Sequence, residues 1–111
     1  MGARTQVYIK DTKVYLYSHY DSFEIETIVA KALSKRWRWD DPEYLARIIF
    51  DAMIGDSFGE ETGYGIGTQQ HGDIDNLVTI DCEEQTVQYQ IPTMNKTIKK
   101  YTFESFIKKY A

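Results

Sequence analysis

The sequence predicts an α+β fold, with an antiparallel sheet of two hairpins and helices packed on one face. Apolar and polar residues alternate in two pairs of short segments, 4–9 with 14–19 and 77–82 with 86–91. Between these pairs, and again at the carboxyl end, apolar residues recur at helical spacing. The expected element order is ββααββα or ββααβββα, because strands grouped apart from helices are typical of α+β folds.

The totals indicate one domain spanning 1–111. Its 111 residues, 42% hydrophobic and 14% aromatic, fit a single core. The sequence has neither a run of 18 apolar residues nor an apolar signal-peptide core, so we expect a cytoplasmic protein without membrane insertion. The net charge of -4 disfavours binding to nucleic acid or anionic lipid, although 35–38 and 96–109 are basic.

The first predicted hairpin has one apolar and one polar face. A turn centred on Asp11 and Thr12 fixes the register of the strands. The core face then pairs Ile9 with Val14, Val7 with Leu16, and Thr5 with Ser18. The opposite face sets Tyr8 beside Tyr15, Gln6 beside Tyr17, and Arg4 beside His19, with Asp21 two residues further on.

Two helices are expected to follow as a helical hairpin. The first carries an apolar stripe at Ile25, Ile28, Val29, Ala32 and Leu33, and Asp21 or Ser22 can cap its start. The second is bounded by Asp41 as N-cap, Pro42 at the first helical position and Gly55 at its end. Its stripe consists of Leu45, Ile48, Ile49, Ala52 and Met53.

The segment from Gly55 to Gly72 is rich in glycine and predicts a mobile loop, with Tyr64 as a candidate lid residue. Its Gly-x-Gly-x-Gly run lacks the context of a nucleotide-binding motif, since it precedes a strand and no helix follows it. The second hairpin turns at 83–86 and its last strand ends at Pro92. A short closing helix is expected after Thr102, with the stripe Phe103, Phe106, Ile107 and Tyr110.

Two further features favour structural roles. The run RWRW at 36–39 is compatible with base stacking, but it also suits a helix end, with Trp37 or Trp39 filling the corner of the helical hairpin. The single cysteine, Cys82, is expected to be buried on a strand, where it packs as a small apolar residue.

The candidate functional residues are the two histidines and their neighbouring aspartates. His19 and His71 are each followed two residues later by an aspartate, Asp21 and Asp73. If the loop folds over the first hairpin, two imidazoles and two carboxylates converge, which is enough for a divalent metal or an acid/base pair.

A structural interpretation competes with this one. Asp21 with Glu24 forms a plausible capping box, and Asp73 can close an Asx-turn before the next strand. His19 can bond the backbone or stack on Tyr17. The sequence therefore commits no residue to catalysis or to a metal and requires no cofactor.

Three stretches resemble a group of small uncharacterised proteins common in phages and mobile elements. They are Arg4-Thr5, YSHYD at 17–21 and HGDIDNLVTID at 71–81, where the group has TR, a YxHWDGYP-like segment and HGDIEYLYxID. The chain departs from the group with DSFE in place of DGYP, and with Asn76 and Val78 in place of tyrosines. The resemblance implies a shared fold and a viral setting, in which the cytoplasm is that of the host, and it singles out Arg4, His19, Asp21, His71 and Asp73.

The leading functional hypothesis is a binding protein of phage or mobile-element type. It would contact a protein or a small anionic ligand through the polar face of the first hairpin and the 63–75 loop, using Arg4, Tyr17, His19, His71 and Asp73. One alternative is a hydrolase, metal-dependent or acid/base, built on the paired His-x-Asp motifs. The other is a homodimer that covers the tyrosine-bearing face of the sheet.

Overall fold

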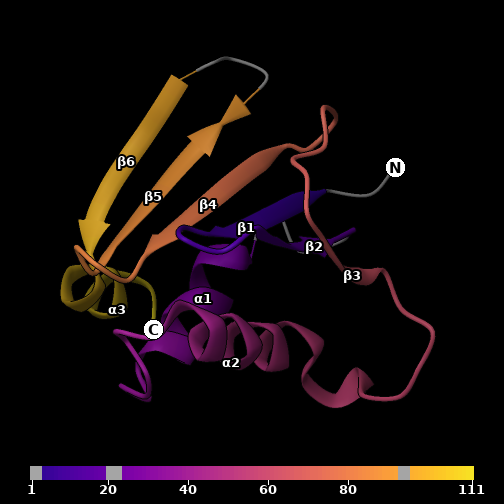
Figure 1. Ribbon diagram of the computed structural model, residues 1–111, viewed down its shortest axis with the longest axis horizontal. Coiled ribbons are helices and arrows are strands. Elements are labelled where there is room, and N and C mark those ends of the chain that lie inside the picture. Colours follow the sequence, from indigo (N-terminus) through magenta and orange to yellow (C-terminus); the bar gives the residue numbers. More distant parts are fainter. Residues whose placement is uncertain (1–3, 20–23, 93–95) are drawn as a thin grey trace.

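Strands of alternating polarity join into one six-stranded sheet with the order β3-β2-β1-β4-β5-β6 (Figure 1). The computed structural model describes residues 4–19, 24–92 and 96–111. Within these ranges the strands are β1 (Thr5–Ile9), β2 (Val14–Ser18), β3 (Tyr64–Gly67), β4 (Asn76–Asp81), β5 (Thr86–Ile91) and β6 (Lys96–Thr102). The helices are α1 (Ile25–Leu33), α2 (Pro42–Ile54) and α3 (Phe103–Tyr110), with a 3-10 turn, η1 (Gly55–Ser57), after α2.

The α+β class and the mostly antiparallel sheet agree with the sequence, but the element order differs from both predicted orders. The described order is ββααββββα. The extra strands are β3, in the segment predicted as a mobile loop, and β6, in the basic segment after Pro92. Both lie at the edges of the sheet, where β3 pairs with β2 and β6 with β5. For β3, with its two glycines, pairing with a neighbour rather than local residue preference therefore makes the strand.

The two predicted hairpins form and lie side by side. Strands β1 and β2 have the expected register, with Ile9 opposite Val14 and Tyr8 opposite Tyr15. Strands β4 and β5 pair Ile80 with Val87. The hairpins meet through a parallel pairing of β1 with β4, so the sheet is not antiparallel throughout.

The helix boundaries follow local capping chemistry in α2 and α3. Asp41 accepts a hydrogen bond from the Tyr44 amide at 3.4 Å, and α2 ends at Gly55, whose φ of 56° lies in the region that glycine favours. Thr102 Oγ1 accepts from the Ser105 amide at 3.1 Å and begins α3.

The start of α1 differs from the prediction. Glu24 takes the N-cap position, not the third helical position that a capping box requires, and its side chain makes no capping hydrogen bond. The proposed caps Asp21 and Ser22 lie outside the described residues.

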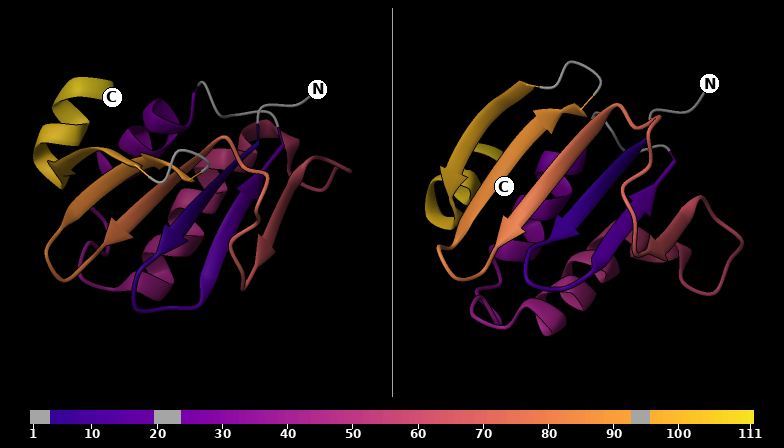
Figure 2. Two further views of the ribbon diagram at one scale, coloured as in Figure 1. Left: turned by 90° about the horizontal axis from the view of Figure 1, so that it is seen from above. Right: turned by 45° about the horizontal axis from the view of Figure 1, so that its top comes forward.

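A single core lies between the sheet and the helices. Figure 2 shows α1, α2 and α3 on the same side of the sheet. The fully buried side chains of this layer include Val7, Ile9, Leu16, Ile25, Val29, Leu33, Leu45, Ile49, Val78, Ile80, Val87 and Phe106. The other face of the sheet is consequently left without helical cover.

Trp39 fills the corner of the helical hairpin, as the structural interpretation of RWRW predicts. Its indole N–H donates to the carbonyl of Leu33 at 3.0 Å, and its ring meets Phe103 edge-on with centroids 5.1 Å apart. Arg36 makes a two-pronged ion pair with Glu104 of α3 at 2.5 and 2.7 Å, whereas Trp37 remains 58% exposed. This segment therefore joins α3 to the helical hairpin.

No helix in the described ranges has both the length and the apolar character needed to cross a bilayer.

Replacing a core phenylalanine should destabilise the chain much more than replacing an exposed one. The Phe106 side chain is fully buried and Phe58 is 86% exposed. Phe106→Ala should lower the free energy of unfolding by about 3–5 kcal/mol because it removes buried apolar surface and leaves a cavity. Phe58→Ala should change it by less than about 0.5 kcal/mol. Urea unfolding followed by circular dichroism measures both values, and equal losses would contradict the assignment of the core.

Candidate functional site

The open face of the sheet, opposite the helices, carries the polar and aromatic side chains of the first hairpin. Because side chains alternate along a strand, Gln6 and Tyr8 of β1 share this face with Tyr15 and Tyr17 of β2. The rings of Tyr8 and Tyr15 stack with their centroids 4.6 Å apart. Gln6 is nevertheless completely buried, so something other than a helix covers it.

That cover is the segment 68–75, which we call the crossover. Strand β3 lies beyond β2, and β4 lies on the other side of β1, so the chain must cross the first hairpin between them. It crosses on the open face, as its contacts with Gln6 and Tyr17 show, and Figure 2 displays the path. The loop around His71 and Asp73 thus folds back over the first hairpin, the condition under which the sequence predicts a site.

The Gln6 side-chain amide holds the middle of the crossover. Its Nε2 donates to the carbonyl of Gln69 at 3.1 Å, and its Oε1 accepts from the amide of His71 at 2.9 Å. Both the nitrogen and the oxygen of this buried side-chain amide are thus hydrogen-bonded to the backbone of the crossover. The backbone at His71 is fixed, while the residue itself remains exposed.

Arg4 holds the far end of the crossover. Its Nη1 lies 2.6 Å from Asp73 Oδ2. Its backbone amide donates to Asp75 Oδ2 at 3.0 Å, and the Asp75 amide donates back to the Arg4 carbonyl at 2.8 Å. The buried Ile74 lies between these two aspartates and anchors the segment.

Tyr17 contacts both histidines. Its hydroxyl lies 3.3 Å from His19 Nδ1, and its ring lies against that of His71 with centroids 5.1 Å apart. The backbone amide of His19 donates to the carbonyl of Gly63 at 3.1 Å, which extends the pairing of β2 with β3. His19 and His71 therefore approach the same tyrosine from different segments of the chain.

Of the five residues predicted to bind a partner, His71 and Asp73 lie in the crossover, Arg4 and Tyr17 contact it, and His19 is linked to it through Tyr17. Arg4 pairs with Asp73, and Tyr17 contacts His19 and His71. The predicted pairing of Arg4 with His19 is not part of the ladder, which ends with Thr5 opposite Ser18, and the Arg4 guanidinium turns to Asp73 instead. The candidate Asp21 lies outside the described residues.

Two contributors to this site were missed from the sequence. Gln6 was placed on the polar face but given no role, and Asp75 was not considered. The local signal is a glutamine between two core-facing positions of a strand, Thr5 and Val7, which does not identify its partners 63 and 65 residues away.

The positions of these side chains limit the metal-binding and acid/base chemistry of the site. Within 4–19, 24–92 and 96–111, no group of three or more His, Cys, Asp and Glu side chains is placed to hold a metal ion. The carboxylate of Asp73 is already engaged by the guanidinium of Arg4, with 2.6 Å between Nη1 and Oδ2.

Cys82 is buried with 5% of its surface exposed, as predicted. Burial, followed by the negative charge of Asp81, raises the pKa of its thiol to about 11. Because the thiolate is the reactive form, Cys82 is a packing residue and not a nucleophile at neutral pH.

No protein-family model, curated protein or solved structure matches the chain.

Removing the Gln6 amide should loosen the crossover. The near-isosteric Gln6→Met should lower the free energy of unfolding by about 1–3 kcal/mol, because two buried hydrogen bonds are lost. Hydrogen exchange of the His71 amide should accelerate by at least about tenfold. Gln88→Met is the matched control, because Gln88 lies in β5 on the open face of the sheet that also carries Gln6. This variant should leave the His71 amide protected. Unchanged exchange in Gln6→Met would show that other contacts hold the crossover.

The buried thiol should make stability depend on alkaline pH. The thiol of an unfolded chain ionises near its ordinary pKa of 9.0, and the folded one near 11. Its contribution is therefore fully present below pH 9 and is lost as the pH rises through 11. The stability gap between the wild type and Cys82→Ala should be wider at about pH 7 than at about pH 10.5 in urea unfolding. A gap that is constant or widens with pH would contradict the burial of this thiol.

Proposed function

We propose that the chain is a protein-binding module whose contact surface is the crossover together with the adjoining face of the first hairpin. This crossover surface consists of Arg4, Tyr17, His19, His71 and Asp73, with the exposed residues 69–72 between them. The supporting observation is the fixing of an exposed polar segment on a rigid sheet by the buried side chain of Gln6. Exposed segments held in place by a rigid scaffold are common binding elements.

The charges of the crossover surface favour a protein over a small anion. The guanidinium of Arg4 is already paired with Asp73, and Asp75 lies on its backbone side, so one positive charge faces two negative charges. An anion would have to displace Asp73 and then meet both carboxylates. Tyrosine and histidine side chains, in contrast, provide contact area together with hydrogen-bonding groups, which suits a protein interface.

We place this module in the cytoplasm of the cell that makes it and, following the resemblance to phage and mobile-element proteins, propose a host protein as partner. The homodimer alternative remains a second candidate, since Tyr8, Tyr15 and Tyr17 are each only half buried on the open face. The hydrolase alternative would need Asp21 and a carboxylate free to assist an imidazole, whereas Asp73 is bound to Arg4.

Photo-crosslinking from the crossover tests the proposal. Benzoylphenylalanine at Gln70, an exposed crossover residue, should form one discrete adduct with a second protein in the native cell. The same probe at Lys31, exposed on α1, should not form it. His71→Ala should reduce the adduct at Gln70 by at least about fivefold, because it removes an exposed ring while the backbone bond to Gln6 remains.

Three outcomes would count against the proposal. They are an equal adduct from both probe positions, no adduct from Gln70, or an adduct whose mass is twice that of the chain. The last would support the homodimer instead.

A further inference from the structure

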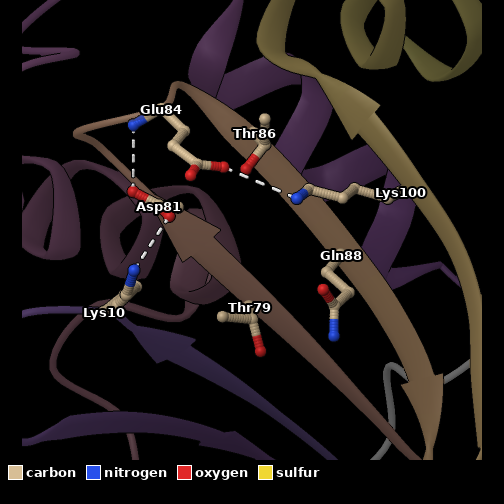
Figure 3. Close-up of a pocket in the computed structure, with 7 residues that line it drawn as sticks. All are labelled: Lys10, Thr79, Asp81, Glu84, Thr86, Gln88 and Lys100. Atoms are coloured by element: carbon tan, nitrogen blue, oxygen red, sulfur yellow. Dashed lines mark hydrogen bonds and ion pairs between the residues drawn. The ribbon is translucent and has the colours of Figure 1, made fainter.

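A second polar feature lies on the open face, at the opposite end of the strands from the crossover surface. It is a cavity of about 250 Å³ whose floor is formed by Thr79 of β4 with Thr86 and Gln88 of β5 (Figure 3). Thr79 and Gln88 are opposite one another in the sheet, so these side chains form one continuous polar surface. The four remaining lining residues are charged and form two ion pairs around the rim.

The inner ion pair is firmly held. Asp81 Oδ1 accepts the amides of Glu83 and Glu84, each at 3.0 Å, and its Oδ2 lies 3.2 Å from Lys10 Nζ. Burial acts to raise the pKa of Asp81, but the amides and Lys10 together outweigh it and lower that pKa. Asp81 is thus committed to the turn. The Lys10 side chain is 47% exposed, and its ammonium group has three hydrogens, so it can donate to a ligand as well as to Asp81.

The outer ion pair is loose. Lys100 Nζ lies 3.5 Å from Glu84 Oε1, and the two side chains are 56% and 57% exposed. Exposed pairs of this length contribute little to stability, so the two can separate at small cost. In Figure 3 the two side chains reach towards each other beside Thr86, at the cavity edge.

The charges around the cavity limit the chemistry of a ligand. Two ammonium groups and two carboxylates give no net charge. A simple anion would face both carboxylates, and a simple cation would face both ammonium groups. All seven lining side chains are polar, which disfavours apolar and stacking ligands. A small zwitterion carries one positive and one negative group, so it can pair with a carboxylate and an ammonium group of the rim at the same time.

We propose that this cavity binds a free α-amino acid with a carboxamide or carboxylate side chain. The α-carboxylate accepts from Lys100, and the α-ammonium donates to Glu84, so that one weak ion pair is replaced by two. The side chain of the ligand extends along the floor to Lys10 and Gln88, which supply donors to its oxygen. The volume of about 250 Å³ suits a molecule smaller than a typical drug.

This site is separate from the crossover surface and does not depend on it. It is formed by β4, β5, the turn between them, β6 and the residue after β1, whereas the crossover surface is formed by Tyr17 of β2, the residues before β1 and after β2, and the segment 68–75. A failure of one proposal therefore leaves the other standing.

Titration by nuclear magnetic resonance tests the ligand class. L-Glutamine should shift the amide signals of Thr79, Thr86 and Gln88 in a saturable manner at concentrations below about 10 mM. Glutarate, which lacks the ammonium group, and L-leucine, which lacks the polar side chain, should each bind at least about tenfold more weakly. The zwitterion proposal fails if L-glutamine does not saturate in this range, or if glutarate binds as tightly.

Neighbouring lysines of β6 provide a matched pair of variants. Lys100→Gln should weaken L-glutamine binding by at least about tenfold, since it removes the partner of the α-carboxylate. Lys99→Gln changes the adjacent residue, which pairs with Tyr89 and points to the other face, and should bind normally. Both lysines are exposed, so both variants should fold. Equal affinity of the two variants would place the ligand elsewhere.

Discussion

The two hydrogen bonds of the Gln6 side chain hold the connection between β3 and β4 in place, which strand pairing alone does not do. Strand β3 and strand β4 lie on opposite sides of the first hairpin, so the backbone between them must run across strands whose own amides are already paired. Peptide groups in such a position need partners from side chains. A buried glutamine offers a donor and an acceptor at once, and it thereby sets where His71 and Asp73 lie.

The distribution of functions over the sheet follows from having helices on one side only. The packed face is mostly apolar, with Thr5, Ser18 and Asn76 as buried polar exceptions, and it carries the hydrophobic core of the domain. The open face is divided by the stacked pair Tyr8 and Tyr15 into two ends. At one end the crossover lies on the strands, and at the other the polar cavity of Thr79 and Gln88 stays uncovered. A single sheet can in this way present two chemically different surfaces without enlarging its core.

Local sequence signals accounted for the elements that depend on local chemistry. The alternation in β1 and β2 fixed their register, and Asp41, Pro42 and Gly55 bounded α2. The pattern failed for β3, where Gly65 and Gly67 carry no strand preference and the partner β2 supplies the order. It also failed for the parallel pairing of β1 with β4, because no local pattern encodes which distant strands meet. The two-residue period of a strand is enough to predict that Tyr17 and His19 share a face. The hydrogen bonds of Gln6 cannot be predicted in this way, because they depend on where the crossover lies in the folded chain.

The central parallel pair also shapes the order in which the domain can form. Thr5 and Asn76, its first partners, are 71 residues apart in the chain. During synthesis β1 and β2 can pair as soon as they emerge, but the inner edge of β1 stays open until β4 has been made. Long-range contacts of this kind slow folding, because chain closure comes before the contacts that compensate for it. The nascent chain thus exposes one unpaired edge of β1, the strand that carries Val7 and Ile9, until β4 has been made, and an open strand edge favours aggregation or capture by a chaperone.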